Sequence, residues 1–371
     1  MESANVKIKE VRARQIKINL PDPIQLGSYL MRFRTFCHVS VELVDGTVGS
    51  AFGLDRSAPL VEAITKLIAV PYKEIFTGNP VDTYDQLMRQ SSPALSAGAS
   101  LRGLSLVDLA AHDAVAKYEQ RTVLARFGKT EKTIPKWAVI GYPPSRGPEE
   151  IAWEVAAAVA AGAVGVKLPV GLTPELTRER IKAALETKLC PVATDLAWSC
   201  RSAEDAVKIV GGLDLAWVED PFVPGNMDQL RKLRKLQSSP VATGDDESHL
   251  YHPQALLDTD SVDIIRLDAT CQGGLSRIFL LNDYLAEKNI PISWHVYDSW
   301  HSQVASIIDA PTFSIEFSAP GANVDPLQEL IFARRNETAA QDIYGWKFTM
   351  PDLADEVTAL AGGAKWIPIP R

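Results

Sequence analysis

The sequence predicts an α/β fold, a closed barrel of alternating strands and helices, preceded by a smaller α+β unit. Three observations lead to this prediction. From Ile134 onwards, eight short apolar runs alternate with amphipathic segments of helical length. No glycine-rich phosphate loop opens any of these helices, which disfavours an open dinucleotide-binding sheet. Several runs end in an ionisable residue, which is typical of the carboxyl face of a barrel, where catalytic residues lie.

The first part of the chain has a different pattern of polar and apolar residues. Residues 6–55 alternate polar and apolar side chains as strands do, with a turn at Asp45-Gly46. Residues 58–127 show apolar positions at helical spacing. We therefore expect an α+β unit over residues 1–130, completed by the C-terminal segment 326–371, and a barrel over residues 131–325.

The barrel elements can be assigned along the chain from this alternation. The expected strands are Trp137–Gly141, Gly165–Val170, Val192–Leu196, Leu215–Glu219, Val241–Asp245, Val262–Asp268, Ile292–Val296 and Phe313–Phe317. The expected helices between them include Pro174–Glu186, Ala203–Val210, Met227–Leu236 and Ser276–Lys288.

Composition narrows the class of partner. The 371 residues are 46% hydrophobic and 23% charged, with a net charge of −8, which argues against binding nucleic acid or a membrane surface. The N-terminus has no apolar signal core, and the four cysteines form no CxxC pair. We expect a cytoplasmic protein with reduced thiols that acts on a small molecule.

Three acidic residues end consecutive apolar runs: Asp195, Glu219 and Asp245. If these runs are neighbouring parallel strands, all three carboxylates emerge at the same end of the barrel. Like charges brought together repel one another unless a cation lies among them, and oxygen-only ligation favours Mg²⁺. The sequence therefore predicts a magnesium site.

Four more ionisable residues end other apolar runs: Lys167, Asp268, His295 and Glu316. Each of them alone is best explained as a capping or loop charge. Seven such residues at strand ends are difficult to explain as packing, because buried strands are normally apolar. The set favours a catalytic centre.

The motifs that contain these residues resemble those of the enolase superfamily, in its mandelate racemase and muconate lactonizing branch. The matching stretches are Val166-Lys-Leu-Pro, Ala193-Thr-Asp, Trp217-Val-Glu-Asp-Pro, Thr243-Gly-Asp, Leu267-Asp-Ala-Thr-Cys-Gln-Gly-Gly, Trp294-His and Ile315-Glu-Phe. The resemblance implies a modified TIM barrel of the (β/α)7β type, a capping domain over residues 1–130, one Mg²⁺ ion, and removal of a proton α to a carboxylate. It also implies a symmetric homo-oligomer.

The same resemblance implies roles for individual residues. Asp195, Glu219 and Asp245 would bind the metal. Most relatives have Glu at the third position, so Asp246 or Glu247 could assist the shorter Asp245.

Asp268 and His295 would form the base, with the carboxylate fixing the imidazole tautomer. Glu316 would donate a hydrogen bond to the substrate carboxylate, which requires a protonated side chain.

The second strand departs from the racemase pattern Lys-x-Lys, since Lys167 is followed by Leu168 and then Pro169. Lys167 would stabilise the substrate carboxylate, and proline cannot transfer a proton. One base suits β-elimination, so the leading hypothesis is a sugar-acid dehydratase near the rhamnonate dehydratases. The alternatives are a racemase, epimerase or cycloisomerase, and a non-catalytic barrel that binds a carboxylate.

Five further residues are candidate substrate contacts. Arg32 and Arg34 flank the segment from Gln25 to Met31, which in the family closes over the site. Trp300 and His301 follow the predicted base, and His249 follows the third metal strand. For each of these side chains, a solvated or packing role is about as plausible.

Overall fold

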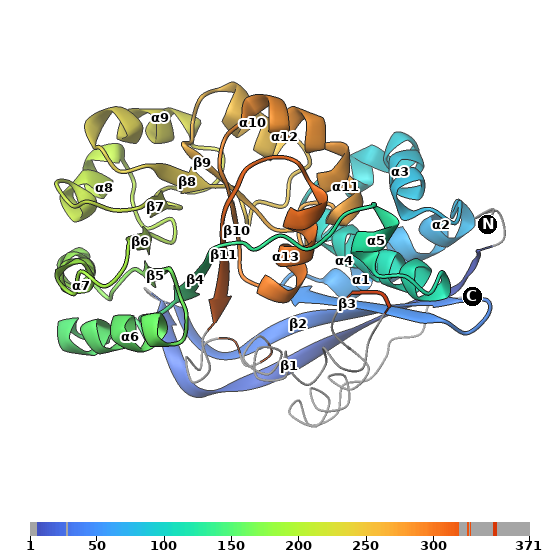
Figure 1. Ribbon diagram of the computed structural model, residues 1–371, viewed down its shortest axis with the longest axis horizontal. Coiled ribbons are helices and arrows are strands. Elements are labelled where there is room, and N and C mark those ends of the chain that lie inside the picture. The colour runs from blue at the N-terminus through green and yellow to red at the C-terminus, as the bar shows by residue number, and fades with distance from the viewer. Residues whose placement is uncertain (1–5, 27–28, 319–324, 326, 328–343, 347–371) are drawn as a thin grey trace.

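The computed structural model describes residues 6–26, 29–318, 325, 327 and 344–346, with the side chains of residues 21, 22, 25, 26 and 29 excepted. It contains an N-terminal antiparallel sheet domain beside a closed barrel (Figure 1). The predicted fold class is confirmed.

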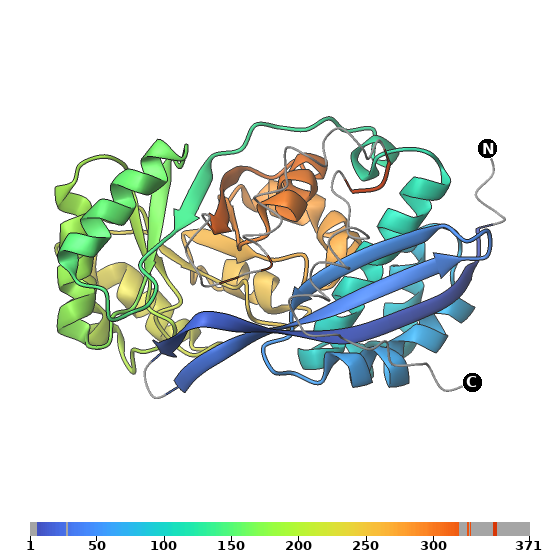
Figure 2. The same cartoon turned by 90° about the horizontal axis from the view of Figure 1, so that it is seen from below.

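The N-terminal sheet has three antiparallel strands: β1 (Ile8–Leu26), β2 (Tyr29–Leu43) and β3 (Val48–Leu54). At the predicted turn, the backbone N–H and the hydroxyl of Thr47 both donate to the Asp45 carboxylate. The expected loop over 25–31 is shorter than predicted, since β1 extends to Leu26 and β2 begins at Tyr29. Figure 2 shows these long twisted strands passing from the N-terminal helices to the barrel.

The helices of this domain pack against one face of the sheet or against one another. They are α1 (Leu60–Ala63), the π-helical turn η2 (Ile64–Ile68), α2 (Ala69–Glu74), α3 (Pro80–Leu95), α4 (Gly98–Tyr118) and α5 (Val123–Arg126). Every residue of α4 from Leu101 to Ala116 is buried, because the helix lies between the sheet and the barrel helix α11 (Gly274–Leu280). Gly49 allows the close approach of sheet and helix, since a Cβ there would lie 2.2 Å from the backbone of Ala110.

Eight parallel strands close the barrel in the order β10-β11-β4-β5-β6-β7-β8-β9. They are β4 (Lys136–Val139), β5 (Gly165–Pro169), β6 (Val192–Asp195), β7 (Val218–Glu219), β8 (Val241–Thr243), β9 (Ile264–Leu267), β10 (Ile292–Trp294) and β11 (Thr312–Ser318). Each lies within a predicted run or extends one residue beyond it. The predicted strands are confirmed.

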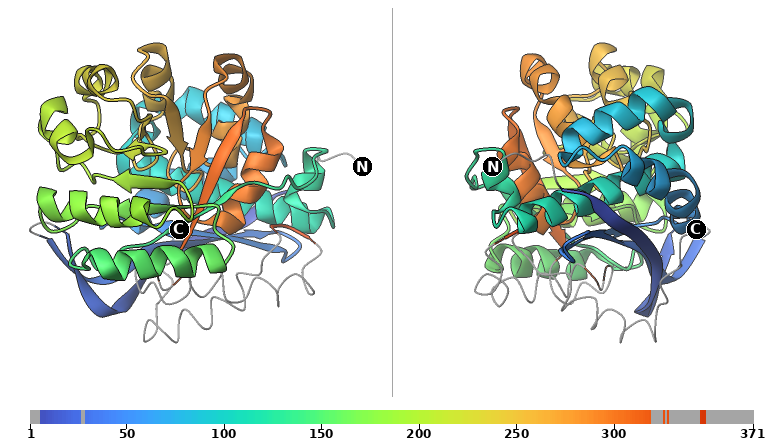
Figure 3. Two further views of the ribbon diagram at one scale, coloured as in Figure 1. Left: turned by 60° about the vertical axis from the view of Figure 1, so that its left-hand side comes forward. Right: turned by 90° about the vertical axis from the view of Figure 1, so that its right-hand side faces the viewer.

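The barrel helices surround these strands (Figure 3). They are α6 (Pro148–Ala160), α7 (Pro174–Glu186), α8 (Ala203–Val210), α9 (Met227–Leu236), α10 (His252–Asp258), α11, α12 (Asn282–Lys288) and α13 (Asp298–Ile307). Three predicted helices match residue for residue. The fourth, expected over 276–288, is two helices, because the chain breaks at Leu281 and Asn282 exchanges hydrogen bonds with Asp309.

Aromatic side chains fill the barrel interior below the strand ends. The rings of Trp137 and Trp217 lie 4.3 Å apart between centroids, in a cluster with Ala193, Ala242 and Ile264. The barrel is therefore packed at this level, and its carboxyl end is left for chemistry. Among the described residues, no helix is long and apolar enough to cross a membrane.

Part of the C-terminal segment can be placed. Trp346 is buried against α4, where its indole N–H donates to the Leu109 carbonyl at 3.0 Å. Most of the segment 326–371 lies outside the described residues, so the predicted domain boundaries stay predictions.

Candidate active site

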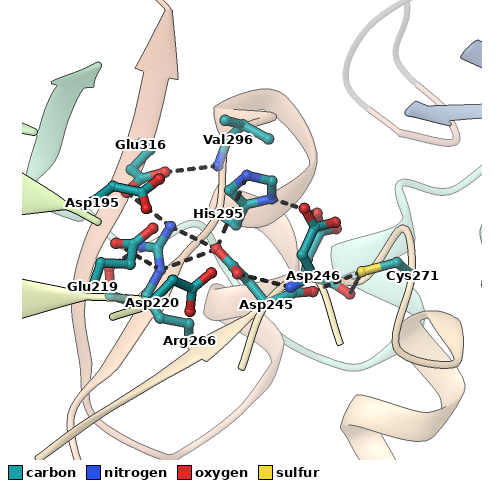
Figure 4. A network of polar contacts seen from close by, with 12 residues as sticks. Asp195, Glu219, Asp220, Asp245, Asp246, Arg266, Cys271, His295, Val296 and Glu316 are labelled. Carbon is teal, nitrogen blue, oxygen red and sulfur yellow. Dashed lines mark hydrogen bonds and ion pairs between the residues drawn. The ribbon is translucent and has the colours of Figure 1, made fainter. Parts of the chain in front are cut away.

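A pocket opens where the carboxyl ends of the barrel strands face the N-terminal sheet. Arg34 and Arg56 line it from the sheet domain. The barrel contributes all three predicted metal ligands together with His295 and Glu316 (Figure 4). It also contributes Lys167. The structure therefore brings together residues that the sequence scatters over six strand ends.

The three predicted metal ligands reach the pocket from adjacent strands. Asp195 and Glu219 are the last residues of β6 and β7. Asp245 follows β8 after Gly244, whose φ of +128° favours glycine. A Cβ at Gly244 would lie 3.0 Å from the carbonyl oxygen of Arg266, so this turn fits tightly against β9.

Lys167 projects from β5 into this group of carboxylates. Its ammonium forms ion pairs with Glu219 and, at 2.8 Å, with Glu316, and it lies 3.9 Å from Asp195. Burial disfavours the charge on Lys167, but Glu219 and Glu316 outweigh burial and raise its pKa. Lys167 is therefore a charged lysine at the pocket floor.

A second buried cation, Arg266, was missed by the sequence analysis. It lies on β9 two residues before Asp268, and its side chain is 0% exposed. Its guanidinium donates to Asp245 at 2.9 Å and forms ion pairs with Glu219 at 3.2 Å and Glu316 at 2.8 Å. The inward direction of Arg266 could have been predicted from the sequence, because residues two apart in a strand share a face and Asp268 was expected inside the barrel.

The chemistry of the donor set fits a hard divalent cation. Seven carboxylates line the pocket against three lysine and arginine side chains. The pKa of Glu219 is raised to about 7, because burial together with Glu316 and Asp195 outweighs Arg266 and Lys167. A divalent cation would relieve this crowding.

The present arrangement is nevertheless shaped by the protein's own cations. Among the described residues, no three Asp, Glu, His or Cys side chains are grouped closely enough to hold a metal ion. Lys167 and Arg266 form ion pairs with the two carboxylate oxygens of Glu219, and Arg266 also pairs with one oxygen of Asp245. Binding of Mg²⁺ would therefore have to displace contacts that the chain makes with itself.

His295 and Asp268 form a hydrogen-bonded pair at the ends of β10 and β9. His295 Nδ1 lies 2.9 Å from Asp268 Oδ2. Burial opposes a charge on His295, but Asp245 and Asp268 outweigh it and raise its pKa above the ordinary value. Burial would raise the pKa of Asp268, yet the hydrogen bond from His295 and the proximity of His301 hold it well below its usual range. The pair has the geometry of an oriented base.

The expectation that Glu316 is protonated is wrong. Burial alone would raise its pKa, but Arg266 and Lys167 lower it to about 2. Glu316 is therefore a carboxylate at neutral pH, and a carboxylate accepts hydrogen bonds without donating any.

The two acids that could have assisted Asp245 have other partners. Asp246 forms ion pairs with Arg56 at 2.5 Å and Arg102 at 2.9 Å, both from the N-terminal domain. Glu247 forms an ion pair with His252. Asp246 lines the pocket together with the predicted ligands, whereas Glu247 lines the neighbouring hollow.

Only one of the five candidate substrate contacts lines the pocket. Arg34 does so, whereas Arg32 is exposed outside it. Trp300 is fully buried, with its ring 4.9 Å from that of Trp346.

The two candidate histidines also lie elsewhere. His301 is buried behind Asp268, where it accepts a hydrogen bond from Ala269 N at 3.0 Å. His249 is exposed in a neighbouring hollow with His252. The structure corrects these expectations, because sequence proximity to a strand end does not fix the direction of a side chain.

Several pocket residues were not expected. Tyr142 and Trp198 lie in loops after β4 and β6, and Asp220 directly follows Glu219. The strand-end rule could have identified all three. No pattern in the sequence points to Arg56, which reaches the pocket from the segment after β3.

Comparison with known proteins agrees with this architecture. The model of the family described as enolase C-terminal domain-like matches residues 150–361. D-galactarolactone cycloisomerase from Agrobacterium fabrum is 24% identical over 340 residues, which cover 88% of this chain and 87% of that protein. L-rhamnonate dehydratase from Saccharopolyspora erythraea is 25% identical over 262 residues, which cover 66% of this chain and 63% of that protein.

One solved structure illustrates the shared fold. It is L-talarate/galactarate dehydratase from Salmonella typhimurium LT2, liganded with Mg and L-lyxarohydroxamate. The match covers 84% of this chain and 83% of that chain, with 19% identity and a TM-score of 0.71.

Proposed function

This chain belongs to the enolase C-terminal domain-like family, and from that premise we propose that it is a magnesium-dependent dehydratase of a sugar acid. The substrate would be an aldonate or aldarate, and the product a 2-keto-3-deoxy acid. One observation carries the proposal: the pocket pairs His295 with Asp268, as an oriented base would be paired, and has Pro169 at the position of the second base of racemases.

The proposed reaction begins at His295. Nδ1–H donates to Asp268, which leaves Nε2 free to accept the proton from the carbon next to the substrate carboxylate. Nε2–H then protonates the hydroxyl on the neighbouring carbon. That C–O bond breaks, water leaves, a C=C bond forms, and the resulting enol tautomerises to the keto acid.

Other residues of the pocket stabilise charge. Asp195, Glu219 and Asp245 would hold Mg²⁺, which when bound neutralises the charge that develops on the substrate carboxylate. Lys167 supplies a fixed positive charge beside that carboxylate. Glu316 is ionised and would position Lys167 without donating to the substrate.

The test is incubation with a panel of aldonates and aldarates in the presence of Mg²⁺. Keto-acid formation would be detected with semicarbazide. His295→Asn should abolish it, and His249→Asn is the matched control because His249 lies outside the pocket. Binding of sugar acids without any turnover would instead indicate a non-catalytic barrel.

A second candidate is a racemase, epimerase or cycloisomerase. It is favoured by the cycloisomerase relative, which covers most of this chain. Incubation in D₂O separates the two. Exchange of the α-proton without keto-acid formation would replace dehydration as the proposed reaction.

A further inference from the structure

Arg266 lies beneath the pocket and does not line it. The pocket-lining residues include the acids that Arg266 contacts, but Arg266 itself is fully buried behind them. It therefore acts on the site from below, through Glu219, Asp245 and Glu316. These three acids come from β7, the end of β8, and β11.

The guanidinium is fixed in place by neutral hydroxyls. Its Nη1 donates to Ser293 Oγ at 2.5 Å, and Ser293 Oγ lies 2.6 Å from Ser314 Oγ. Both serines are fully buried. This support leaves the Nε and Nη2 edge directed at the carboxylates, so the positive charge points at the site.

The oxygens of two proposed metal ligands are already occupied. Glu219 Oε1 pairs with Lys167, and Oε2 accepts from the Trp217 indole at 2.8 Å and pairs with Arg266 at 3.2 Å. Asp245 Oδ1 accepts from Asp246 N at 2.7 Å, while Oδ2 accepts from Arg266. A metal ion would have to compete for these oxygens.

Asp195 differs from the other two. Its Oδ1 accepts one hydrogen bond, from Ala197 N at 2.8 Å, and its Oδ2 lies 3.9 Å from the Lys167 ammonium. A metal ion would therefore compete with the protein's own hydrogen-bond donors and cations mainly for the oxygens of Glu219 and Asp245. Both of them contact Arg266.

We propose that Arg266 is an internal counter-cation, a positioning residue that holds the ligand carboxylates together without metal and weakens their affinity for Mg²⁺. The inference rests on the proposed magnesium site. Its consequence is coupling: an anionic substrate adds negative charge to the pocket and offsets the repulsion between guanidinium and metal. Metal and substrate therefore bind more tightly together than either does alone.

The first test is calorimetric titration of the wild-type protein with Mg²⁺, with and without tartronate as a non-reacting dicarboxylate. We expect tartronate to tighten Mg²⁺ binding by about 10-fold or more, within the usual range for coupled sites. Equal Mg²⁺ affinity with and without saturating tartronate would overturn the coupling. This measurement does not depend on any variant folding.

The second test titrates Arg266→Gln with Mg²⁺ alone. Loss of the charge should tighten Mg²⁺ binding by about 10-fold, lower the melting temperature of the metal-free protein, and increase the rise in melting temperature that Mg²⁺ causes. Arg266→Lys keeps a cation and should bind Mg²⁺ much as the wild type does. Arg178→Gln is the charge-matched control, because Arg178 binds backbone carbonyls of Ile209 and Gly211 away from the pocket.

The outcomes separate this inference from the proposed function. If neither wild type nor Arg266→Gln binds Mg²⁺, the magnesium site itself is wrong. If both bind Mg²⁺ with equal affinity, the site stands and the role of Arg266 is overturned.

Discussion

Asp245 and Asp246 are neighbours in the chain, but they belong to two different groups of charges. Asp245 faces the barrel interior, where Arg266 and Lys167 accompany Glu219 and Glu316; we call these five residues the inner layer.

Asp246 faces the N-terminal domain, where it pairs with Arg56 and Arg102; we call these three residues the rim. The inner layer is formed by barrel residues alone and includes two of the three predicted metal ligands, Glu219 and Asp245. The rim joins two parts of the chain that lie far apart in sequence. The structure thus separates a carboxylate that lies among the predicted metal ligands from an adjacent one that joins the two domains.

The largest effect should come from removing the base that adjoins the inner layer. His295→Asn should lower kcat by about 10²–10⁴-fold, the usual contribution of a general base. Mg²⁺ affinity and the circular dichroism spectrum should be unchanged. Retention of most of the activity would assign the base to another residue.

Two single substitutions, compared with each other, test whether the inner layer and the rim have separate roles. Asp245→Asn should weaken Mg²⁺ binding by at least about 10-fold, since even residues that only support metal ligands commonly contribute that much. Asp246→Asn should leave Mg²⁺ affinity within about twofold of wild type, because its partners are rim arginines. Calorimetry measures both. Equal losses would mean that the two aspartates share the metal.

The rim should matter for stability more than for chemistry. Arg102→Met should lower the free energy of unfolding by about 1–3 kcal/mol, because it removes a buried partner of Asp246 and a donor to Leu54 O. Urea denaturation measures this change. Lys9→Met, at an exposed ion pair with Glu42, should unfold close to wild type. A similar loss in both variants would remove the special role of the rim.

The smallest expected effect is a shift in the pH profile. His295 must be neutral to accept a proton, so kcat/KM should fall as pH drops below its pKa. Burial lowers that pKa, but Asp245 and Asp268 raise it above the ordinary value of about 6.5.

In Asp268→Asn one of the raising carboxylates is lost, so the acidic limb of the profile should move to lower pH while the rate falls. Measurements of kcat/KM across the pH range give the position of the acidic limb. An unmoved limb would mean that a group other than His295 sets it.

The sequence by itself determined the barrel and the strand-end residues that meet in the pocket. Short apolar runs separated by amphipathic helical segments mark the barrel strands, and a charged residue that ends an apolar run marks the carboxyl face of a barrel. Both signals are local, so Asp195, Glu219 and His295 could be identified without coordinates. The segment Pro174–Glu186 was likewise predicted because its amphipathic pattern is a local feature.

The tertiary structure decided which charges meet. Glu316 is ionised because Lys167 and Arg266 reach it from β5 and β9, which no spacing along the chain reveals. Trp300 and His301 are buried because the residues around them come from distant segments. Which charged side chains pair depends on their distances across the barrel. Those distances are set only when the whole chain has folded.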